Sequence, residues 1–298
     1  MTPADRAAQP PAAPLPPTRI GQRLFEWGSR TYVMGIVNVT PDSFSGDGLL
    51  ATTAGRKGAV VEAAVLQARR MVEDGADILD VGGESTRPGH DVVAEGEESD
   101  RVVPVIVAIH AALPEVPISI DTSKPGVAEA ALDAGASLLN DIWGISTDGA
   151  MRGLAAERGV PMVVMHNRTQ PRYNDFVAEL IDDLRAAVER AVAAGVPRRD
   201  LIVDPGFGFG KTAEHNVMVM RALPQLRGLG QPVLLGTSRK STIGRLLGGL
   251  PPEERLEGTL ATTALGIAAG VDMVRVHDVR PNVRAALVAD AIVRDKLT

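Results

Sequence analysis

The sequence predicts an α/β fold in which strand–helix units repeat around a single (β/α)8 TIM barrel. Two observations carry this prediction. Short apolar runs that suit buried parallel strands recur eight times, and amphipathic periodicity fills most of the intervals between them. The chain has 298 residues with 45% hydrophobic content, which is enough for one barrel of this size. An open doubly wound sheet remains the alternative, because repetition alone does not decide whether the sheet closes.

The expected elements begin with a leader and a hairpin. Residues 1–17 are rich in proline and alanine and have no apolar core, so we expect a disordered leader ahead of a barrel domain over 18–298. Residues 20–32 alternate loosely around Gly28 and Ser29. This alternation predicts a short hairpin that plugs the bottom of the barrel.

The eight strands are expected where the apolar runs lie. They are 33–37, 78–81, 118–120, 137–139, 162–165, 201–203, 233–235 and 273–276. Five of these runs follow a glycine that can close a preceding helix in the left-handed conformation. The clearest helical face has apolar residues every four positions from Phe176 to Val192. The final helices, near 256–269 and 282–293, each carry one apolar face.

Composition excludes several classes of partner. The net charge is -6, from 31 basic and 37 acidic residues, with no long run of either sign. Nucleic acid and anionic membrane surfaces are therefore not expected partners. The absence of cysteine excludes disulfides and thiolate metal sites. With no apolar run long enough to span a bilayer, we expect a soluble, cytoplasmic protein.

Polar residues follow every predicted strand. In a parallel barrel the C-terminal strand ends open onto one face, where the chemistry of this fold takes place. Any one of these residues also suits a helix cap or a loop hydrogen bond, but eight polar ends together favour a site. The strand ends are marked by Asn38, Glu84, Asp121, Asn140, His166, Asp204, the segment 238–240, and Arg275 with His277.

These strand ends offer two kinds of chemistry. Asp121, Asn140 and Asp204 present carboxylate and amide edges that pair with a flat heterocycle bearing amino and ring N–H donors. Arg275 and His277 lie two residues apart, so their side chains point the same way and suit an anion such as phosphate. Lys240 is placed to bridge the two groups.

The glycine-rich stretch 204–212 does not match the common nucleotide loops. The Walker pattern needs four residues between its first glycine and Gly-Lys-Thr, whereas Gly206 leaves three before Gly210. The dinucleotide pattern also fails, because the three glycines alternate singly. We therefore expect Asp204 to serve a site, with the turn bringing the backbone close to a ligand.

Seven motifs together resemble the dihydropteroate synthase family, in family order and over about 32–279. They are 34–45 (MGIVNVTPDSFS), 82–89 (GGESTRPG), 119–122 (SIDT), 140–142 (NDI), 204–212 (DPGFGFGKT), 238–241 (SRKS) and 275–279 (RVHDV). The family fold is a (β/α)8 barrel, in agreement with the repetition above. The resemblance implies a transferase of folate biosynthesis that condenses 7,8-dihydropterin-6-ylmethyl diphosphate with 4-aminobenzoate, giving 7,8-dihydropteroate and diphosphate.

The resemblance also implies a role for each matching residue. For the pterin these are Asp121, Asn140, Asp204, Lys240, Met165 and Gly236. For the diphosphate they are Asn38, Arg275 and His277, with Asn38 also contacting Mg2+. For 4-aminobenzoate they are Thr86, Arg87, Pro88, Phe209 and Ser241, a pocket in which sulfonamides would compete. Lys240, Arg275 and His277 would act in catalysis, and the family is commonly a homodimer.

Two loops and one departure complete the comparison with the family. Residues 40–48 and 84–91 are rich in glycine, proline, serine and aspartate, which suits loops that close over substrate. After Met165 and His166 the family often continues with a Met-Gln-Gly-like segment, but residues 167–171 here read NRTQP. We expect His166 to be structural, and Lys211 with Thr212 to begin the next helix.

Two other functions remain open. A methyltetrahydrofolate:corrinoid-type methyltransferase shares Asp and Asn contacts to a pterin, but it needs neither the anion clamp nor the Ser-Thr-Arg-Pro loop. A non-catalytic paralogue that binds a pterin or a partner is the second alternative. No motif is visibly broken, which favours the enzyme.

Overall fold

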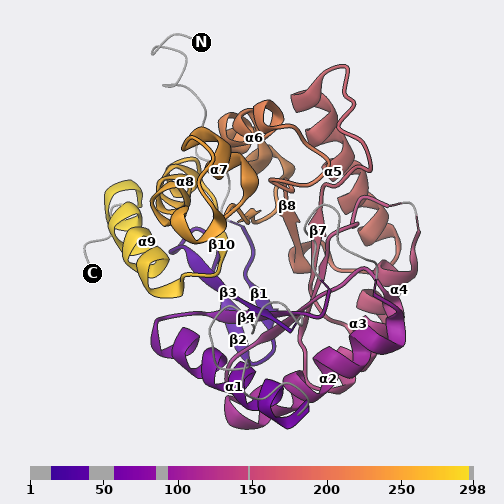
Figure 1. Ribbon diagram of the computed structural model, residues 1–298. Helices are drawn as coiled ribbons and strands as arrows, with labels where there is room; N and C mark the ends of the chain where they lie inside the picture. Colours follow the sequence, from indigo (N-terminus) through magenta and orange to yellow (C-terminus); the bar gives the residue numbers. More distant parts are fainter. Residues whose placement is uncertain (1–14, 40–56, 85–92, 147, 295–298) are drawn as a thin grey trace.

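Eight parallel strands form a barrel that helices surround, and a small hairpin lies beside its first strand in the chain (Figure 1). This computed structural model describes residues 15–39, 57–84, 93–146 and 148–294. Leu15 packs against the apolar cluster at the barrel bottom, and residues 1–14 of the expected leader lie outside the described ranges. No helix within the described ranges is long and apolar enough to cross a membrane.

The strands follow the apolar runs of the sequence closely. The hairpin strands are β1 (Thr18–Ile20) and β2 (Arg23–Phe25), and the barrel strands are β3 (Tyr32–Asn38), β4 (Ile78–Gly82), β5 (Ile118–Asp121), β6 (Leu138–Asp141), β7 (Met162–Met165), β8 (Leu201–Asp204), β9 (Leu234–Leu235) and β10 (Met273–Val276). Each predicted run overlaps its strand, and no boundary differs by more than two residues.

The helices alternate with the strands and form an outer ring (Figure 1). They are α1 (Lys57–Glu73), α2 (Glu95–Ala112), α3 (Pro125–Asp133), α4 (Ala150–Arg158), α5 (Phe176–Ala193), α6 (Ala213–Leu226), α7 (Ser241–Leu246), α8 (Leu256–Ala268) and α9 (Val279–Val293). The face predicted to be buried on α5 is buried at Phe176, Leu180, Leu184 and Val188.

The sheet closes on itself, which excludes the open doubly wound alternative. Its strand order runs β8-β7-β6-β5-β4-β3-β10-β9, with each named pair parallel. A parallel bridge from Val203 to Val233 joins the two ends of this order, and the Val203 amide donates to the carbonyl of Pro232 at 3.0 Å. The repetition read from the sequence is therefore that of a barrel.

Alternation along each strand creates two apolar cores. Outward-facing residues such as Leu139, Val164 and Val276 pack with the helices in the larger cluster. Inward-facing residues from the lower strand positions form the second cluster. It contains Met34, Ile78, Leu138, Val163, Ile202, Leu234 and Met273, together with Ile20, Phe25, Trp27 and Tyr32 from the hairpin region.

The hairpin closes the barrel bottom as expected, but its turn was placed wrongly. Ile20 pairs with Arg23, so the turn residues are Gly21 and Gln22, and Gly21 has a φ of 56°. Gly28 and Ser29 instead form the turn that leads into β3, with the Ser29 amide donating to the carbonyl of Glu26. Two glycine turns lie close together here, and pairing register rather than local sequence selects the hairpin turn.

Candidate active site

Many of the inward positions directly above the apolar floor hold charged or polar residues. Inward positions alternate with outward ones, so the residue two positions after each floor residue also faces the barrel interior. Ile78 is thus followed by Asp80, Leu138 by Asn140, and so on around the barrel. The corresponding residues on the other strands include Met165, Asp204, Gly236 and Arg275.

Arg275 lies at the centre of this polar layer. Its Nε donates to Asp80 Oδ2 at 2.5 Å, and its Nη2 donates to Asp121 Oδ2 at 2.5 Å. Asn140 Nδ2 donates to the same Asp80 oxygen at 3.2 Å. One guanidinium therefore connects β10 to β4 and β5, and Asn140 extends the network to β6.

Asp80 is the residue of this network that the motif comparison missed. Its side chain is fully buried between Arg275 and Asn140. The sequence does contain a sign of this role, because a carboxylate interrupts the apolar run 78–81. An acid in a buried strand requires a partner. The partner comes from the far end of the chain, so no local pattern identifies it.

Two buried carboxylate oxygens in the network have no hydrogen-bond partner among the described residues. They are Oδ1 of Asp80 and Oδ1 of Asp121, and the nearby Ser119 hydroxyl also lacks a partner. Ser119 pairs in register with Asp80. Buried acceptors without partners are rare in folded proteins. Such acceptors suit the N–H or O–H donors of a bound molecule, water included.

Burial also changes the protonation of the acids at the strand ends. Loss of solvent raises the pKa of Asp121 to about 7, although Arg275 opposes this change. Burial likewise raises the pKa of Asp204 to about 6, with a hydrogen bond from the Gly206 amide opposing it. The folded state holds these protons at a pH where the unfolded chain has released them. Both acids therefore contribute stability at low pH that is lost as the pH rises toward 7.

Lys240 approaches the same layer from the segment that precedes α7. Burial lowers its pKa to about 8, and the positive charge of Arg275 contributes. Its Nζ lies 3.9 Å from the ring centre of Phe209, close enough for a cation–π contact. The charge of Lys240 also interacts with Asp204 and Asp121, so this side chain connects the acids to Phe209.

The backbone just before Lys240 is held in an unusual conformation. Arg239 has a φ of 57°, a value that residues other than glycine rarely adopt. Its Nε and Nη2 donate to the two Asp278 oxygens at 3.0 and 2.7 Å, and Arg255 donates to its carbonyl at 2.8 Å. These contacts fix the direction from which Lys240 enters the site.

The residues expected at the anion side also lie at strand ends. His277 Nδ1 is 3.0 Å from Ser238 Oγ, which also accepts from the His277 amide at 3.1 Å. Asn38 ends β3 next to Gly82 in register and is half-buried. Arg275 lies on β10, two residues before His277, but gives two of its five N–H donors to Asp80 and Asp121.

Part of the expected aminobenzoate pocket cannot be placed. Thr86, Arg87 and Pro88 lie outside the described residues, as do residues 40–48 and most of the loop 84–91. Ser241 begins α7 and is exposed, one residue after Lys240. Phe209 is half-buried and contacts Lys240.

The His166 side chain has a structural role, as the sequence indicates. Lys211 does not begin the next helix, in contrast to the expectation from the sequence. The His166 ring is fully buried, with Nε2 3.1 Å from Asp183 and Nδ1 2.9 Å from Lys211. Thr212 caps α6 by accepting from the His215 amide at 3.2 Å. Lys211 precedes that helix, and its side chain turns back to the end of β7 instead of continuing along α6.

The side chains around Asn38 suit a magnesium ion only if a substrate supplies further oxygen ligands. No group of three or more His, Asp or Glu side chains within the described ranges is arranged to hold a metal. Asn38 offers a single amide oxygen. Mg2+ commonly binds through one or two protein groups while substrate phosphates and water complete its octahedron. A diphosphate beside Asn38 would supply those oxygens.

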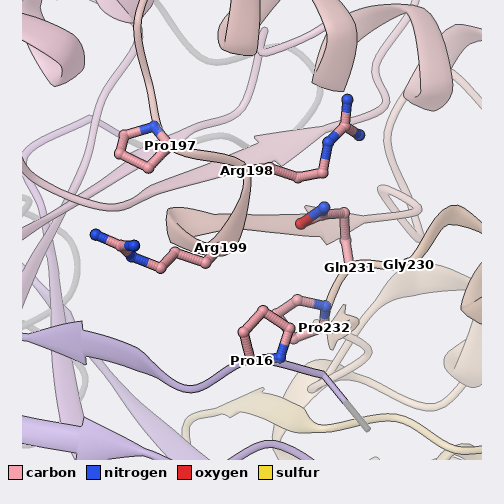
Figure 2. A pocket seen from close by; sticks show the side chains of 7 residues that line it. All are labelled: Pro16, Pro197, Arg198, Arg199, Gly230, Gln231 and Pro232. Atoms are coloured by element: carbon pink, nitrogen blue, oxygen red, sulfur yellow. The ribbon is translucent and has the colours of Figure 1, made fainter. Parts of the chain in front are cut away.

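Two cavities lie at the opposite end of the barrel and belong to a different surface. One has a volume of about 450 Å3 and is lined by Pro197, Arg198, Arg199, Gln231 and neighbours (Figure 2). These residues precede β8 and β9, so the cavity opens at the N-terminal strand ends. The charged layer is at the C-terminal ends, and the two cavities play no part in it.

Comparison with known proteins agrees with the geometry. Residues 34–277 match the family model described as pterin binding enzyme. The chain is 50% identical over 277 residues to a dihydropteroate synthase of Clostridium beijerinckii, covering 93% of this chain and 99% of the relative. The dihydropteroate synthase of Xanthomonas albilineans, solved with 4-aminobenzoic acid, has a TM-score of 0.85 at 44% identity, covering 93% of this chain and 98% of that one.

A third similar protein has been solved with a drug bound. The Yersinia pestis dihydropteroate synthase, solved as a sulfonamide drug complex, has a TM-score of 0.84 at 39% identity. The similarity covers 93% of this chain and 99% of that one.

The Asp80 carboxylate is expected to be a main support of the charged layer. Asp80→Asn keeps the shape but leaves a buried guanidinium with one anionic partner fewer, so the free energy of unfolding should fall by about 3 kcal/mol. Urea denaturation measures this change. The matched control is Asp133→Asn, which breaks an exposed pair with Arg158 and should cost under about 1 kcal/mol. Equal effects of the two substitutions would contradict the role given to Asp80.

Proposed function

The chain belongs to the pterin binding enzyme family, and we propose that it acts as a dihydropteroate synthase. Such an enzyme joins 7,8-dihydropterin-6-ylmethyl diphosphate to 4-aminobenzoate, forming 7,8-dihydropteroate and diphosphate. The observation that carries the proposal is the pair of buried, unpartnered carboxylate oxygens on Asp80 and Asp121. A pterin ring carries amino and ring N–H donors that would complete them.

The pterin is proposed to occupy the layer around Asp121, Asn140 and Asp204. Met165 lies beside Asp204 in register and offers an apolar face to a flat ring. At Gly236 an added Cβ would lie 3.8 Å from Arg275 and 4.0 Å from Asp204, so the missing side chain leaves room between them. Lys240 would lie at the edge of the ring, near Phe209.

The diphosphate is proposed to bind on the side of Asn38, Arg275 and His277. Burial opposes the charge on Arg275, but Asp80 and Asp121 raise its pKa above the ordinary value. Its guanidinium therefore stays cationic, and the N–H donors not used by these acids can face an anion. A magnesium ion bound with the diphosphate would supply further positive charge at the leaving oxygens.

The chemistry follows from where charge develops. The C–O bond between the pterin methylene and the diphosphate breaks, and the electron pair leaves with the diphosphate. A cationic clamp stabilises that charge more in the transition state than in the substrate. The arylamine nitrogen then forms the new C–N bond and loses one proton. We favour a dissociative order of events, because an electron-rich pterin can carry positive charge at the methylene.

Single-turnover rates that rise steeply with the nucleophilicity of substituted anilines would count against this dissociative order.

The aminobenzoate is proposed to lie between Phe209, Ser241 and the segment 86–88. Sulfonamides are therefore expected to compete with it, in keeping with the sulfonamide complex of the Yersinia pestis relative. The methyltransferase alternative loses support, since it offers no use for the anion clamp. A cytoplasmic location stays a prediction from the sequence.

Turnover tests the function directly. Purified protein mixed with the pterin diphosphate, labelled 4-aminobenzoate and Mg2+ should form labelled dihydropteroate, and a chelator should abolish product. Lys240→Met should lower kcat/KM by at least about tenfold, a loss of about 1.4 kcal/mol of transition-state stabilisation. Arg185→Met, which removes an exposed charge on α5, is the control and should leave kcat/KM unchanged. A folded protein that binds the pterin but forms no product would support the non-catalytic paralogue instead.

A homodimer is proposed through the outer faces of α8 and α9. These helices pack side by side, and they expose Leu265, Leu287, Val288 and Ile292 at 57–77% of their surface. A cluster of exposed apolar side chains of this kind is typical of a protein interface. The family resemblance favours a second copy as the partner.

Sedimentation should show a dimer in the wild-type protein. Ile292→Asp should shift the protein toward the monomer, because a carboxylate in an apolar interface loses its hydration. Leu66→Asp introduces the same charge at an exposed leucine on α1 and should leave the dimer intact. A monomeric wild-type protein at micromolar concentration would refute this interface.

A further inference from the structure

The turn 206–210 lies directly against the segment that follows β7. A Cβ atom added at Gly206 would collide with the carbonyl of His166, and one added at Gly210 would collide with the backbone of Arg168. Both glycines also have positive φ, of 66° and 53°. The two backbones can approach this closely only because side chains are absent. The turn therefore takes its position from the end of β7.

Lys211 fastens these two segments together from the inside. Its Nζ donates to the carbonyl of His166 at 3.1 Å and to the carbonyl of Phe209 at 3.0 Å. A third contact, at 2.9 Å, reaches His166 Nδ1. All three donors of an ammonium group are thus directed at acceptors on the turn and on the β7 end. The function proposed above gives this half-buried lysine no role.

The His166 ring, which contacts Lys211, is itself held in place. Burial lowers the pKa of Lys211 to about 7, and below that pH its ammonium only donates. His166 Nδ1 then accepts, and the proton lies on Nε2, which donates to Asp183 at 3.1 Å. Asp183 also accepts from Arg168 Nη2 at 2.7 Å. Burial lowers the pKa of His166 to about 3, which keeps the ring neutral and able to accept.

The residues that depart from the family motif provide further support. Arg168 lies in the segment 167–171, and its guanidinium lies 4.5 Å from the ring centre of Tyr173. Tyr173 in turn donates its hydroxyl to the carbonyl of Gly210 at 2.8 Å. Arg168 and Tyr173 therefore support the Gly210 end of the turn, and Lys211 holds the turn at Phe209.

Phe209 is the side chain whose position depends on this arrangement. Its amide donates to the carbonyl of Gly206 at 3.0 Å, and the amide of Gly208 donates to Asn216 Oδ1 at 2.7 Å. The Phe209 ring lies against Lys240 Nζ, and Gly208 lies beside the aliphatic carbons of the Lys240 side chain. A shift of the turn would change the distance between Phe209 and Lys240.

We propose that Lys211 is a positioning residue that holds Phe209 at the aminobenzoate side of the site. It acts through the carbonyl of Phe209 and through His166, and it touches no substrate. This role rests on the proposed function for its link to aminobenzoate. The contact between the turn and the end of β7 stands apart from that function and can be tested separately.

Hydrogen exchange of the ligand-free protein tests the contact itself. Lys211→Met keeps the length of the side chain but removes all three donors. Amides in 206–210 should then exchange about tenfold faster, while those of β8 below them should not change. Unchanged exchange in this turn would overturn the proposal, whether or not the protein turns over substrate.

Steady-state kinetics tests the link to aminobenzoate. In Lys211→Met the KM for 4-aminobenzoate should rise about tenfold, with kcat within about threefold and the Kd for the pterin diphosphate within about twofold. Faster exchange without a rise in this KM would overturn the link, and loss of turnover in the wild type would instead refute the proposed function.

Two further variants separate positioning from general loosening of the fold. Thr212→Ala removes the cap of α6 one residue along the chain, so it should lower Tm with no change in KM. Tyr173→Phe removes a single hydroxyl and should raise the same KM by a smaller factor. It also provides a test if Lys211→Met does not fold. An equal rise of KM in Thr212→Ala would show that loss of stability alone explains the effect.

Discussion

The structure depends on placing several charges in a buried layer at the mouth of the barrel. Each buried charge loses hydration, and that cost is offset only where another charge or a hydrogen bond replaces the water. Arg275 meets this condition by joining Asp80 and Asp121 from strands far apart in the sequence. Oδ1 of Asp80 and Oδ1 of Asp121 have no partner within the described residues. A ligand rich in N–H donors would suit these acceptors.

The rest of the fold serves this layer. An apolar floor of inward-facing residues lies below it, and Phe25, Trp27 and Tyr32 close the floor with mutual ring contacts. The period of two along each strand then brings one inward residue per strand to the next level. Above that level two turns carry Phe209 and Lys240, and contacts with neighbouring segments fix both turns. The turn 206–210 rests on the end of β7, and the Arg239 pair with Asp278 orients the entry of Lys240.

Much of this arrangement can be predicted from the sequence, and its gaps have physical causes. Apolar runs and polar strand ends locate the strands, the open face and residues such as Asp204, because these depend on local pattern. The hairpin turn was placed wrongly at Gly28, since two glycine turns compete and only pairing register separates them. Asp80 was missed because its partner lies 195 residues away. The sequence places Lys211 at a helix start, but its side chain turns to His166 instead. The direction of one long side chain depends on what lies across the fold, which local sequence does not reveal.

Burial in this layer removes water from its carboxylates, which raises their pKa and leaves acceptors that the N–H donors of a bound ring can satisfy. Carboxyl 13C NMR of aspartate-labelled, ligand-free protein measures this most directly, with signals assigned from Asp121→Asn and Asp204→Asn. Midpoints of about 7 for Asp121 and about 6 for Asp204 are the expected result. Midpoints near the ordinary aspartate value of about 4 would contradict the account.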